Sequence, residues 1–120
     1  MKKTVFILDD SLTNLTKAEQ ILSPRYNVLA LETAAQMFEM LDKTVPNLIL
    51  LDIEMPEMDG FEVFAKLEAN EDWKDIPVVY FTAHTKEEYI SQCLETGACD
   101  IVIKPYDDET ILNTVRTHIA

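Results

Sequence analysis

Residues 48–60 run Leu-Ile-Leu-Leu-Asp-Ile-Glu-Met-Pro-Glu-Met-Asp-Gly. Four consecutive aliphatic residues without polar alternation are typical of a strand buried on both faces of a parallel sheet. Asp52 follows them directly. In an open parallel sheet, ligands bind outside the carboxyl ends of the strands, where Asp52 would lie. The stretch therefore predicts an α/β fold with a polar site at one edge of its sheet.

The same alternation of buried strand and amphipathic helix continues on both sides of this stretch. Further apolar runs occupy residues 5–8, 28–31, 77–81 and 101–103, and helical spacing of apolar residues separates them. A capping box, in which Gln36 reaches back to Thr33, predicts one helix start; Thr85 and Glu88 predict another, and Gly97 a helix end. Five strands alternating with five helices predict a doubly wound parallel sheet, as one domain over residues 1–120. Among small folds of this kind, five strands fit the flavodoxin-like fold, and the strand order 2-1-3-4-5 is inferred from that fold class.

Composition limits the classes of partner. The chain has 22 acidic and 10 basic residues and a formal net charge of −12. Such a surface repels phosphates and anionic lipids, so neither direct nucleic-acid binding nor membrane binding is expected. The first apolar run is too short for a signal peptide or a membrane span, which predicts a cytoplasmic protein. Cys93 and Cys99, without a CxxC motif, are predicted to be reduced and at least partly buried.

The residues that follow the predicted strands form a chemically coherent set: Asp9 and Asp10, Asp52, Thr82, and Lys104. Three converging carboxylates repel one another unless one is protonated or a cation lies among them. Oxygen ligands without His or Cys suit Mg²⁺. A lysine and a hydroxyl complete a site equipped for phosphoryl transfer onto an aspartate. Taken singly, each of these residues is more often a turn or cap residue, and only their joint occurrence favours a site.

These residues resemble the receiver domain of two-component response regulators. The matching segments are 6–10, 48–60, 81–83 and 104–106, and the resemblance covers essentially the whole chain. It implies that Asp52 accepts a phosphoryl group from a sensor histidine kinase or a histidine phosphotransfer protein. It further implies that Asp10, Asp52 and the main-chain carbonyl of Glu54 ligate Mg²⁺ (or Mn²⁺), and that Asp9 acts through a bound water.

The resemblance also implies roles for the rest of the site. Lys104 would pair with a phosphoryl oxygen across a cis Lys104-Pro105 bond, and Thr82 would bond another. Glu54 and His84 would flank the path of the hydrolytic water. Gly60 is expected to supply backbone freedom before the third helix. Such a domain catalyses only its own phosphorylation and dephosphorylation, so it is not expected to be an enzyme in its own right.

The output of the domain is predicted to be a conformational change of the face formed by the fourth helix, fifth strand and fifth helix. Members of the family usually carry an aromatic switch residue where this chain has Ile101, so a backbone shift is expected to replace the side-chain switch. Tyr106 is expected to be the exposed aromatic residue of that face. The sequence does not identify the downstream effector. It also leaves open whether the domain forms a homodimer when it is phosphorylated.

Three alternatives compete with this interpretation. A pseudo-receiver that acts only as an interaction module usually lacks one of the acidic or lysine positions, and none is missing here. A flavodoxin-like electron carrier needs a Ser/Thr/Gly-rich loop after the first strand, whereas residues 9–14 are Asp-Asp-Ser-Leu-Thr-Asn. An aspartyl-phosphate phosphatase carries a second Asp two residues after the nucleophile, where this chain has Glu54.

Overall fold

The computed structural model describes residues 2–83 and 87–120, without the side chain of Tyr89. A single parallel sheet has the strand order β2-β1-β3-β4-β5, which confirms the predicted order. The strands are β1 Thr4–Leu8, β2 Asn27–Leu31, β3 Leu48–Asp52, β4 Val78–Thr82 and β5 Asp100–Ile103. Every residue of β3 and β4 is buried, as expected of central strands covered on both faces.

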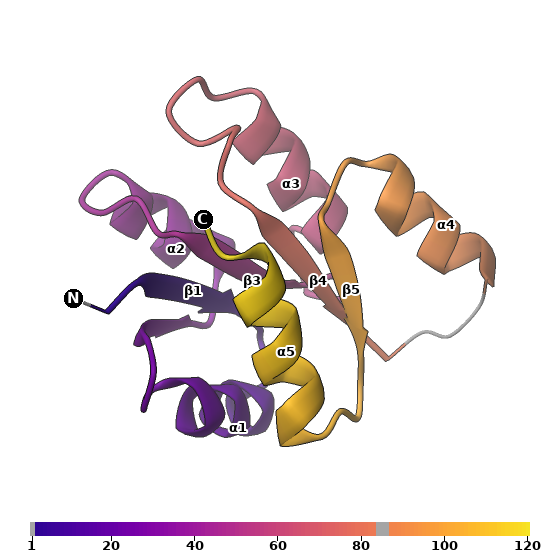
Figure 1. Ribbon diagram of the computed structural model, residues 1–120. Helices are drawn as coiled ribbons and strands as arrows, with labels where there is room; N and C mark the ends of the chain where they lie inside the picture. The colour runs from indigo at the N-terminus through magenta and orange to yellow at the C-terminus, as the bar shows by residue number, and fades with distance from the viewer. Residues whose placement is uncertain (1, 84–86) are drawn as a thin grey trace.

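Five helices cover the sheet, with two on one face and three on the other (Figure 1). They are α1 Leu12–Leu22, α2 Ala34–Leu41, α3 Gly60–Glu68, α4 Glu87–Glu95 and α5 Asp108–His118. Alternate strand residues feed the two cores: Leu50 packs in the core under α1 and α5, and Leu51 in the core under α2, α3 and α4. Each face of the sheet therefore contributes to its own hydrophobic core, and the sheet lies between the two cores.

Side-chain caps begin four of the helices. Ser11, Thr33, Asp59 and Asp107 accept hydrogen bonds from backbone N–H groups of the first turns of α1, α2, α3 and α5. The predicted capping box at α2 is wrong in one detail, because Gln36 accepts from the N–H of Glu32, one residue before the cap. Thr85, predicted to start α4, lies outside the described residues.

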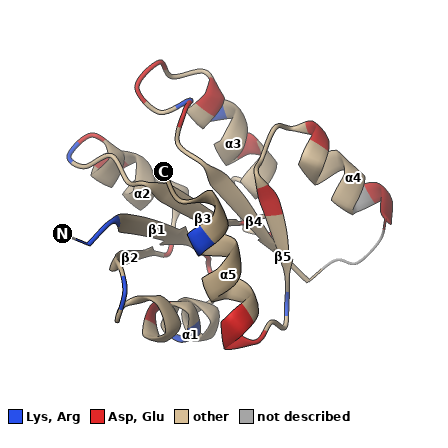
Figure 2. Ribbon diagram, viewed as in Figure 1, with Lys and Arg blue, Asp and Glu red and all other residues tan. Residues whose placement is uncertain are grey.

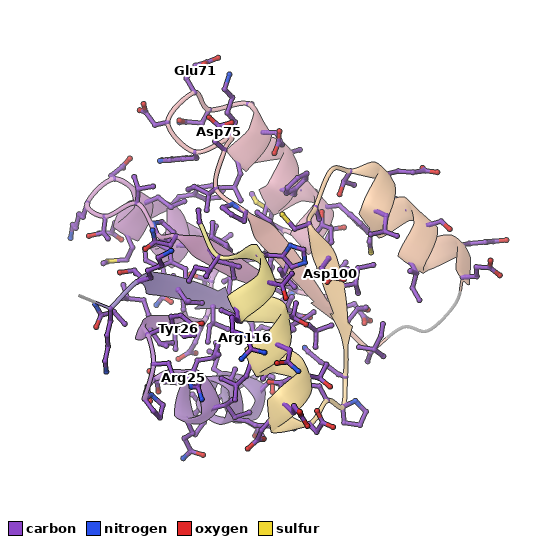
Figure 3. The ribbon with its side chains drawn as sticks, in the orientation of Figure 1. Arg25, Tyr26, Glu71, Asp75, Asp100 and Arg116 are labelled. Atoms are coloured by element: carbon purple, nitrogen blue, oxygen red, sulfur yellow. The ribbon has the colours of Figure 1, made fainter. Side chains whose placement is uncertain are left out.

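Gly97 follows α4 with a φ of 99°, which confirms the predicted glycine at this helix end. Cys93 is buried within α4, but Cys99 is exposed, so the prediction that both cysteines are at least partly buried is wrong for Cys99. Asp100 begins β5 (Figure 3), and its carboxylate lies 3.0 Å from Nε2 of His118 on α5. This contact joins the edge strand to the end of the last helix.

The charge of the molecule is spread over its surface. Acidic residues occupy the loop after α3, both ends of α4 and the start of α5 (Figure 2). In the part of the chain that the structure describes, no helix is both long and apolar enough to cross a bilayer.

Candidate functional site

Parallel pairing brings the predicted polar residues to one edge of the sheet. In register, Leu8 of β1 lies beside Leu51 of β3, and Thr82 of β4 lies beside Ile103 of β5. The residues that follow these positions, Asp9, Asp52 and Lys104, therefore meet at the carboxyl edge. This convergence follows from the topology, because three strands that are far apart in sequence end at the same level.

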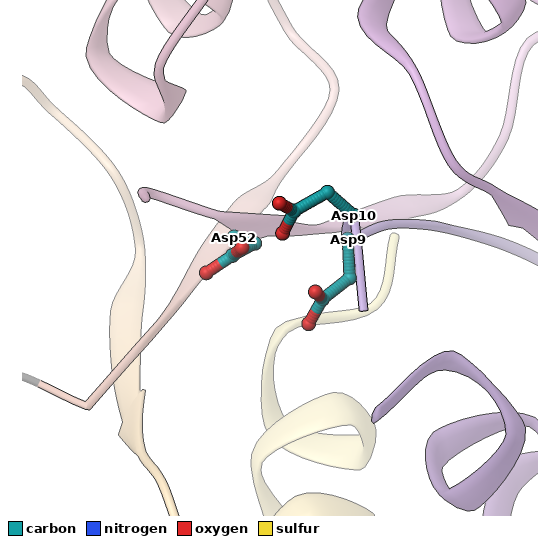
Figure 4. A group of neighbouring side chains, drawn as sticks. All are labelled: Asp9, Asp10 and Asp52. Carbon is teal, nitrogen blue, oxygen red and sulfur yellow. The ribbon is translucent and has the colours of Figure 1, made fainter. Parts of the chain in front are cut away.

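Three carboxylates gather at this edge. One oxygen from each of Asp9, Asp10 and Asp52 lies within 4.8 Å of the other two (Figure 4). Asp9 and Asp52 are buried, with 1% and 4% of their surfaces exposed, whereas Asp10 faces solvent. The cluster is thus open on the Asp10 side and closed beneath.

Lys104 bridges the two buried carboxylates. Its Nζ lies 2.9 Å from Asp9 Oδ2 and 3.1 Å from Asp52 Oδ1. The Lys104-Pro105 bond is cis, as predicted. Nζ also lies 5.8 Å from the ring centroid of Phe81, so an aromatic side chain of β4 forms part of the lysine's surroundings.

The site raises the pKa values of two of its members. Burial, together with the negative charge of Asp9, raises the pKa of Asp52 from 3.8 to about 7, although Lys104 opposes this change. Burial alone would lower the pKa of Lys104, but its hydrogen bond with Asp9 and the charge of Asp52 outweigh burial and raise it. Lys104 therefore stays an ammonium, while Asp52 is divided between its acid and carboxylate forms near neutral pH.

Both carboxylate oxygens of Asp9 accept hydrogen bonds from other residues of the protein. Oδ1 accepts a hydrogen bond of 2.9 Å from the N–H of Ser11, and Oδ2 accepts from Lys104. This arrangement orients Asp9 as a support for Lys104, and it leaves Asp10 as the exposed carboxylate of the pair.

Backbone packing holds Asp52 and Thr82 in place. Thr82 is fully buried at the end of β4, and its carbonyl accepts a hydrogen bond of 2.7 Å from the N–H of Lys104. Gly60 lies against the other side of Asp52, where a Cβ would come within 2.7 Å of the Asp52 carbonyl oxygen and of Ile53 Cα. Gly60 is therefore required for close approach of two backbone segments, and the prediction that it supplies conformational freedom gave the wrong reason.

Tyr106 is partly buried, so the prediction of an exposed aromatic residue is wrong. Its ring stacks on Phe81 with centroids 5.5 Å apart, and Lys17 of α1 lies over the ring at 4.3 Å and donates to the Tyr106 carbonyl at 2.8 Å. Burial, with Asp9 and Asp108 nearby, raises the pKa of the Tyr106 hydroxyl to about 12. Tyr106 therefore packs on the α1 and α5 side of the sheet.

The other predicted modulating residues have different surroundings. Ile101 is partly buried and packs on the α4 side of the sheet, and the side chain of Glu54 is exposed in the loop after β3. His84 lies outside the described residues. Sequence reasoning missed Lys17 and the contact of Phe81 with Lys104, because neither contact leaves a local pattern: the residues concerned are 89 and 23 positions apart.

Comparisons with known proteins agree with this geometry. The family model for the response regulator receiver domain matches residues 5–116. A probable cyclic di-GMP phosphodiesterase of Vibrio cholerae is 34% identical over 97% of this chain, and the response regulator PleD of Caulobacter vibrioides is 35% identical over 98%. The chain spans only 26% of the length of each of these relatives.

Solved structures extend the comparison to the fold. The chemotaxis protein CheY4 of Vibrio cholerae superimposes with a TM-score of 0.91 at 24% identity, covering 99% of this chain and all of that one. The receiver domain of the histidine kinase PA1611 from Pseudomonas aeruginosa, described with a magnesium ion in its active-site cleft, has a TM-score of 0.88 at 22% identity, over 98% of each chain. The family model covers nearly the whole chain, and the strand order agrees with it: the chain belongs to the response regulator receiver domain family of two-component systems.

Proposed function

We propose that this receiver domain accepts one phosphoryl group on Asp52 from a phosphohistidine of a sensor histidine kinase or phosphotransfer protein. The observation that carries the proposal is the convergence of Asp52 with two further aspartates and Lys104 at one edge of the sheet. A carboxylate oxygen of Asp52 would form a bond to phosphorus while the bond from phosphorus to the donor imidazole nitrogen breaks. The electron pair of that bond stays on the imidazole, which makes it the leaving group.

The raised pKa of Asp52 supports the proposal that a bound cation is needed for the reaction. Its pKa of about 7 leaves a large share of the side chain protonated in the metal-free protein, whereas the nucleophile must be a carboxylate. A divalent ion beside three carboxylates would lower that pKa by adding positive charge. The donor set of oxygens alone fits Mg²⁺ or Mn²⁺.

The metal would be held by Asp10, Asp52 and the Glu54 carbonyl. Asp9 would act through a water, since both of its oxygens already accept hydrogen bonds from Ser11 and Lys104. When bound, Mg²⁺ would offset the charge that develops on the phosphoryl oxygens. The magnesium described in the receiver domain of PA1611 supports this assignment.

Two further residues would hold the phosphoryl group. Lys104 lies 3.1 Å from Asp52 Oδ1, so its ammonium is placed to pair with an oxygen of a group attached there. The Thr82 hydroxyl, at the end of the neighbouring strand, would donate to another. Glu54 and His84 would modulate dephosphorylation by holding or blocking water.

The signal would leave through α4, β5 and α5. Ile101 lies on β5 with its side chain on the α4 side, and a β-branched residue is stiff about its first torsion. A backbone shift of the segment after Thr82 is therefore the proposed switch. Tyr106 would contribute by packing, because it is stacked on Phe81.

The proposed functional unit is residues 1–120, acting in the cytoplasm as a phosphoacceptor and not as an enzyme with a separate substrate. Its downstream effector is a protein or domain that recognises the α4-β5-α5 face of the receiver domain. The receiver domain presents this face either as a monomer or as a homodimer formed on phosphorylation.

The test is phosphorylation with acetyl phosphate and Mg²⁺, followed by mass spectrometry of the intact protein. We expect the mass of one phosphoryl group to be added to the wild type and none to Asp52→Asn. Asp59→Asn is the matched control: it changes an aspartate of the following loop while keeping a residue that caps α3, and it should label like the wild type. Labelling of Asp52→Asn would refute the assignment, and failure of the wild type to label with either acetyl phosphate or a kinase would favour an interaction module.

A further inference from the structure

A cavity of about 370 Å³ lies beside the acidic cluster, between the start of α2 and the loop from β3 to α3. Its apolar walls include Ala35, Phe38, Met55 and Met58. Cavities that bind small molecules have volumes of roughly 300–1,000 Å³ and are mostly apolar with a few polar groups. This one has the size and composition of a small-ligand site.

The apolar part of the wall is firmly built. Phe38 stacks on Trp73 with ring centroids 5.6 Å apart, which holds the α2 side of the cavity against the body of the domain. On the other side, the N–H of Met58 donates to the Pro56 carbonyl at 2.7 Å, which closes a tight turn around Glu57. An apolar ligand would thus enter a largely preformed space and lose little affinity to reorganisation.

The charges around the cavity favour a cation. Three carboxylates, from Asp10, Glu32 and Glu57, line it against the single ammonium of Lys66. The N–H of Glu32 donates to Gln36 Oε1, which joins the backbone at Glu32 to the first turn of α2. An anionic ligand would meet an excess of negative charge, and a neutral ligand would use only the apolar wall.

We propose that this cavity binds a small amphipathic cation, an ammonium or amidinium group on an apolar body about the size of a phenyl ring. The apolar body would lie against Phe38 and the methionine side chains, and the cationic group would face the three carboxylates. The site is separate from the phosphoacceptor, but it shares Asp10 with the acidic cluster.

Sharing Asp10 makes the two sites antagonistic. The organic cation and the metal would both draw on the same exposed carboxylate, and their like charges repel. Each should therefore weaken the binding of the other by the same factor, since coupling between two sites is reciprocal. This part of the inference rests on the proposed function, because it needs the metal at Asp10. A bound cation would then slow phosphoryl transfer by opposing the metal.

Binding is tested first on the full chain without metal, by titration with three ligands of matched size: phenethylammonium, 2-phenylethanol and phenylacetate. We expect phenethylammonium to bind with a Kd on the order of 1 mM, the alcohol to bind more weakly and the anion most weakly. Amide shift changes should concentrate in residues 32–38 and 55–58. Equal binding of the three ligands, or shift changes elsewhere, would overturn the proposal.

Variants separate this cavity from general attraction to an acidic surface. The double variant Glu32→Gln, Glu57→Gln should weaken phenethylammonium at least three-fold, as the loss of two partly screened ion pairs implies. The double variant Glu39→Gln, Glu68→Gln is the matched control, because it also removes two carboxylates, from α2 and α3, but neither residue lines the cavity; it should bind like the wild type. Ala35→Phe, an exposed position on α2, should fill the cavity and abolish binding without loss of the fold. Unchanged binding in Ala35→Phe refutes the site.

The coupling is tested by repeating the titration with millimolar Mg²⁺. We expect the Kd of phenethylammonium to rise about five-fold or more, and the Kd of Mg²⁺ to rise by the same factor in the presence of phenethylammonium. If phenethylammonium binds and Mg²⁺ binds but neither affects the other, the antagonism is refuted. If Mg²⁺ itself does not bind, the metal site under the proposed function fails, while the cavity stands on the metal-free titration.

Discussion

Asp52 ends β3 and Asp107 caps the start of α5, yet the protein moves their pKa values in opposite directions. The pKa of Asp52 rises to about 7, chiefly because the side chain is buried and secondly because Asp9 lies beside it. The pKa of Asp107, which is in full contact with solvent, is lowered chiefly by hydrogen bonding with the Thr110 side chain and next by the N–H of Thr110, which donates to Asp107 Oδ1 at 2.8 Å. The surroundings of an aspartate therefore determine whether it is a reactive group or a helix cap.

Removing the Lys104 ammonium from beside the buried Asp52 should have the largest effect on the free energy of unfolding. Lys104→Met leaves Asp9 and Asp52 buried without their ammonium partner, which should lower the free energy of unfolding by about 2–4 kcal/mol near pH 8. The loss should shrink near pH 5, where Asp52 is protonated. Chemical denaturation at both values measures it.

Lys74→Met is the control for that variant. Its ammonium forms an exposed pair with Glu71 at 3.0 Å, so its loss should change the free energy of unfolding by less than about 0.5 kcal/mol. A Lys104→Met variant that is no less stable than this control would mean that the buried carboxylates do not depend on Lys104.

Neutralising Asp52 should stabilise the metal-free protein. Because its pKa is higher in the folded state than its ordinary value of 3.8, its contribution to stability is complete below about pH 4 and is lost as the pH rises through about 7. Asp52→Asn should therefore raise the free energy of unfolding near pH 8 by on the order of 1–2 kcal/mol, after allowance for solvent screening.

The measurement is the stability of Asp52→Asn relative to the wild type across pH 4–8, without metal. The difference in free energy of unfolding between the variant and the wild type should increase steadily with pH. It should disappear when Mg²⁺ is added to the wild type, since a ligand that binds only the folded state stabilises the folded state. A gap that does not vary with pH would show that Asp52 is not held as an acid by its surroundings.

Replacing the exposed Asp107 should have a smaller effect on stability, and that effect should have the opposite pH dependence. Asp107→Ala removes the cap of α5 and should lower the melting temperature near pH 7. Because the pKa of Asp107 is depressed in the folded state, its contribution is present above its ordinary value and disappears as the pH falls through the folded value. Melting curves near pH 7 and pH 2 measure the loss, and Asp107→Asn, which keeps a capping oxygen, should differ little from the wild type.

Glu57 offers a third kind of acidic residue and the smallest predicted effect. Its φ of 68° lies in the left-handed region. The effect of Glu57 on the free energy of unfolding therefore comes from its strained backbone and not from its carboxylate. Glu57→Gly should raise the free energy of unfolding by about 0.5 kcal/mol, because relief of the left-handed strain slightly exceeds the greater freedom of glycine in the unfolded chain. Glu57→Ala, which keeps the strain, should give no gain in thermal unfolding.

The sequence alone was enough to predict the architecture. Five short apolar runs alternating with amphipathic segments require a parallel sheet covered on both faces, and the predicted strand order is the observed one. It was also enough to predict that Asp9, Asp10, Asp52 and Lys104 meet, because residues after parallel strands share an edge.

The surroundings of those residues depend on how distant segments of the chain pack together. The stacking of Tyr106 under Lys17, the backbone contact that requires Gly60, the exposure of Cys99 and the cavity beside Asp10 all depend on segments that are distant in sequence. So does the raised pKa of Asp52, which comes from burial and from a neighbour 43 residues away. Strand and helix patterns are local and can be recognised one segment at a time, whereas burial, close approach and electrostatic environment exist only once several segments have packed together.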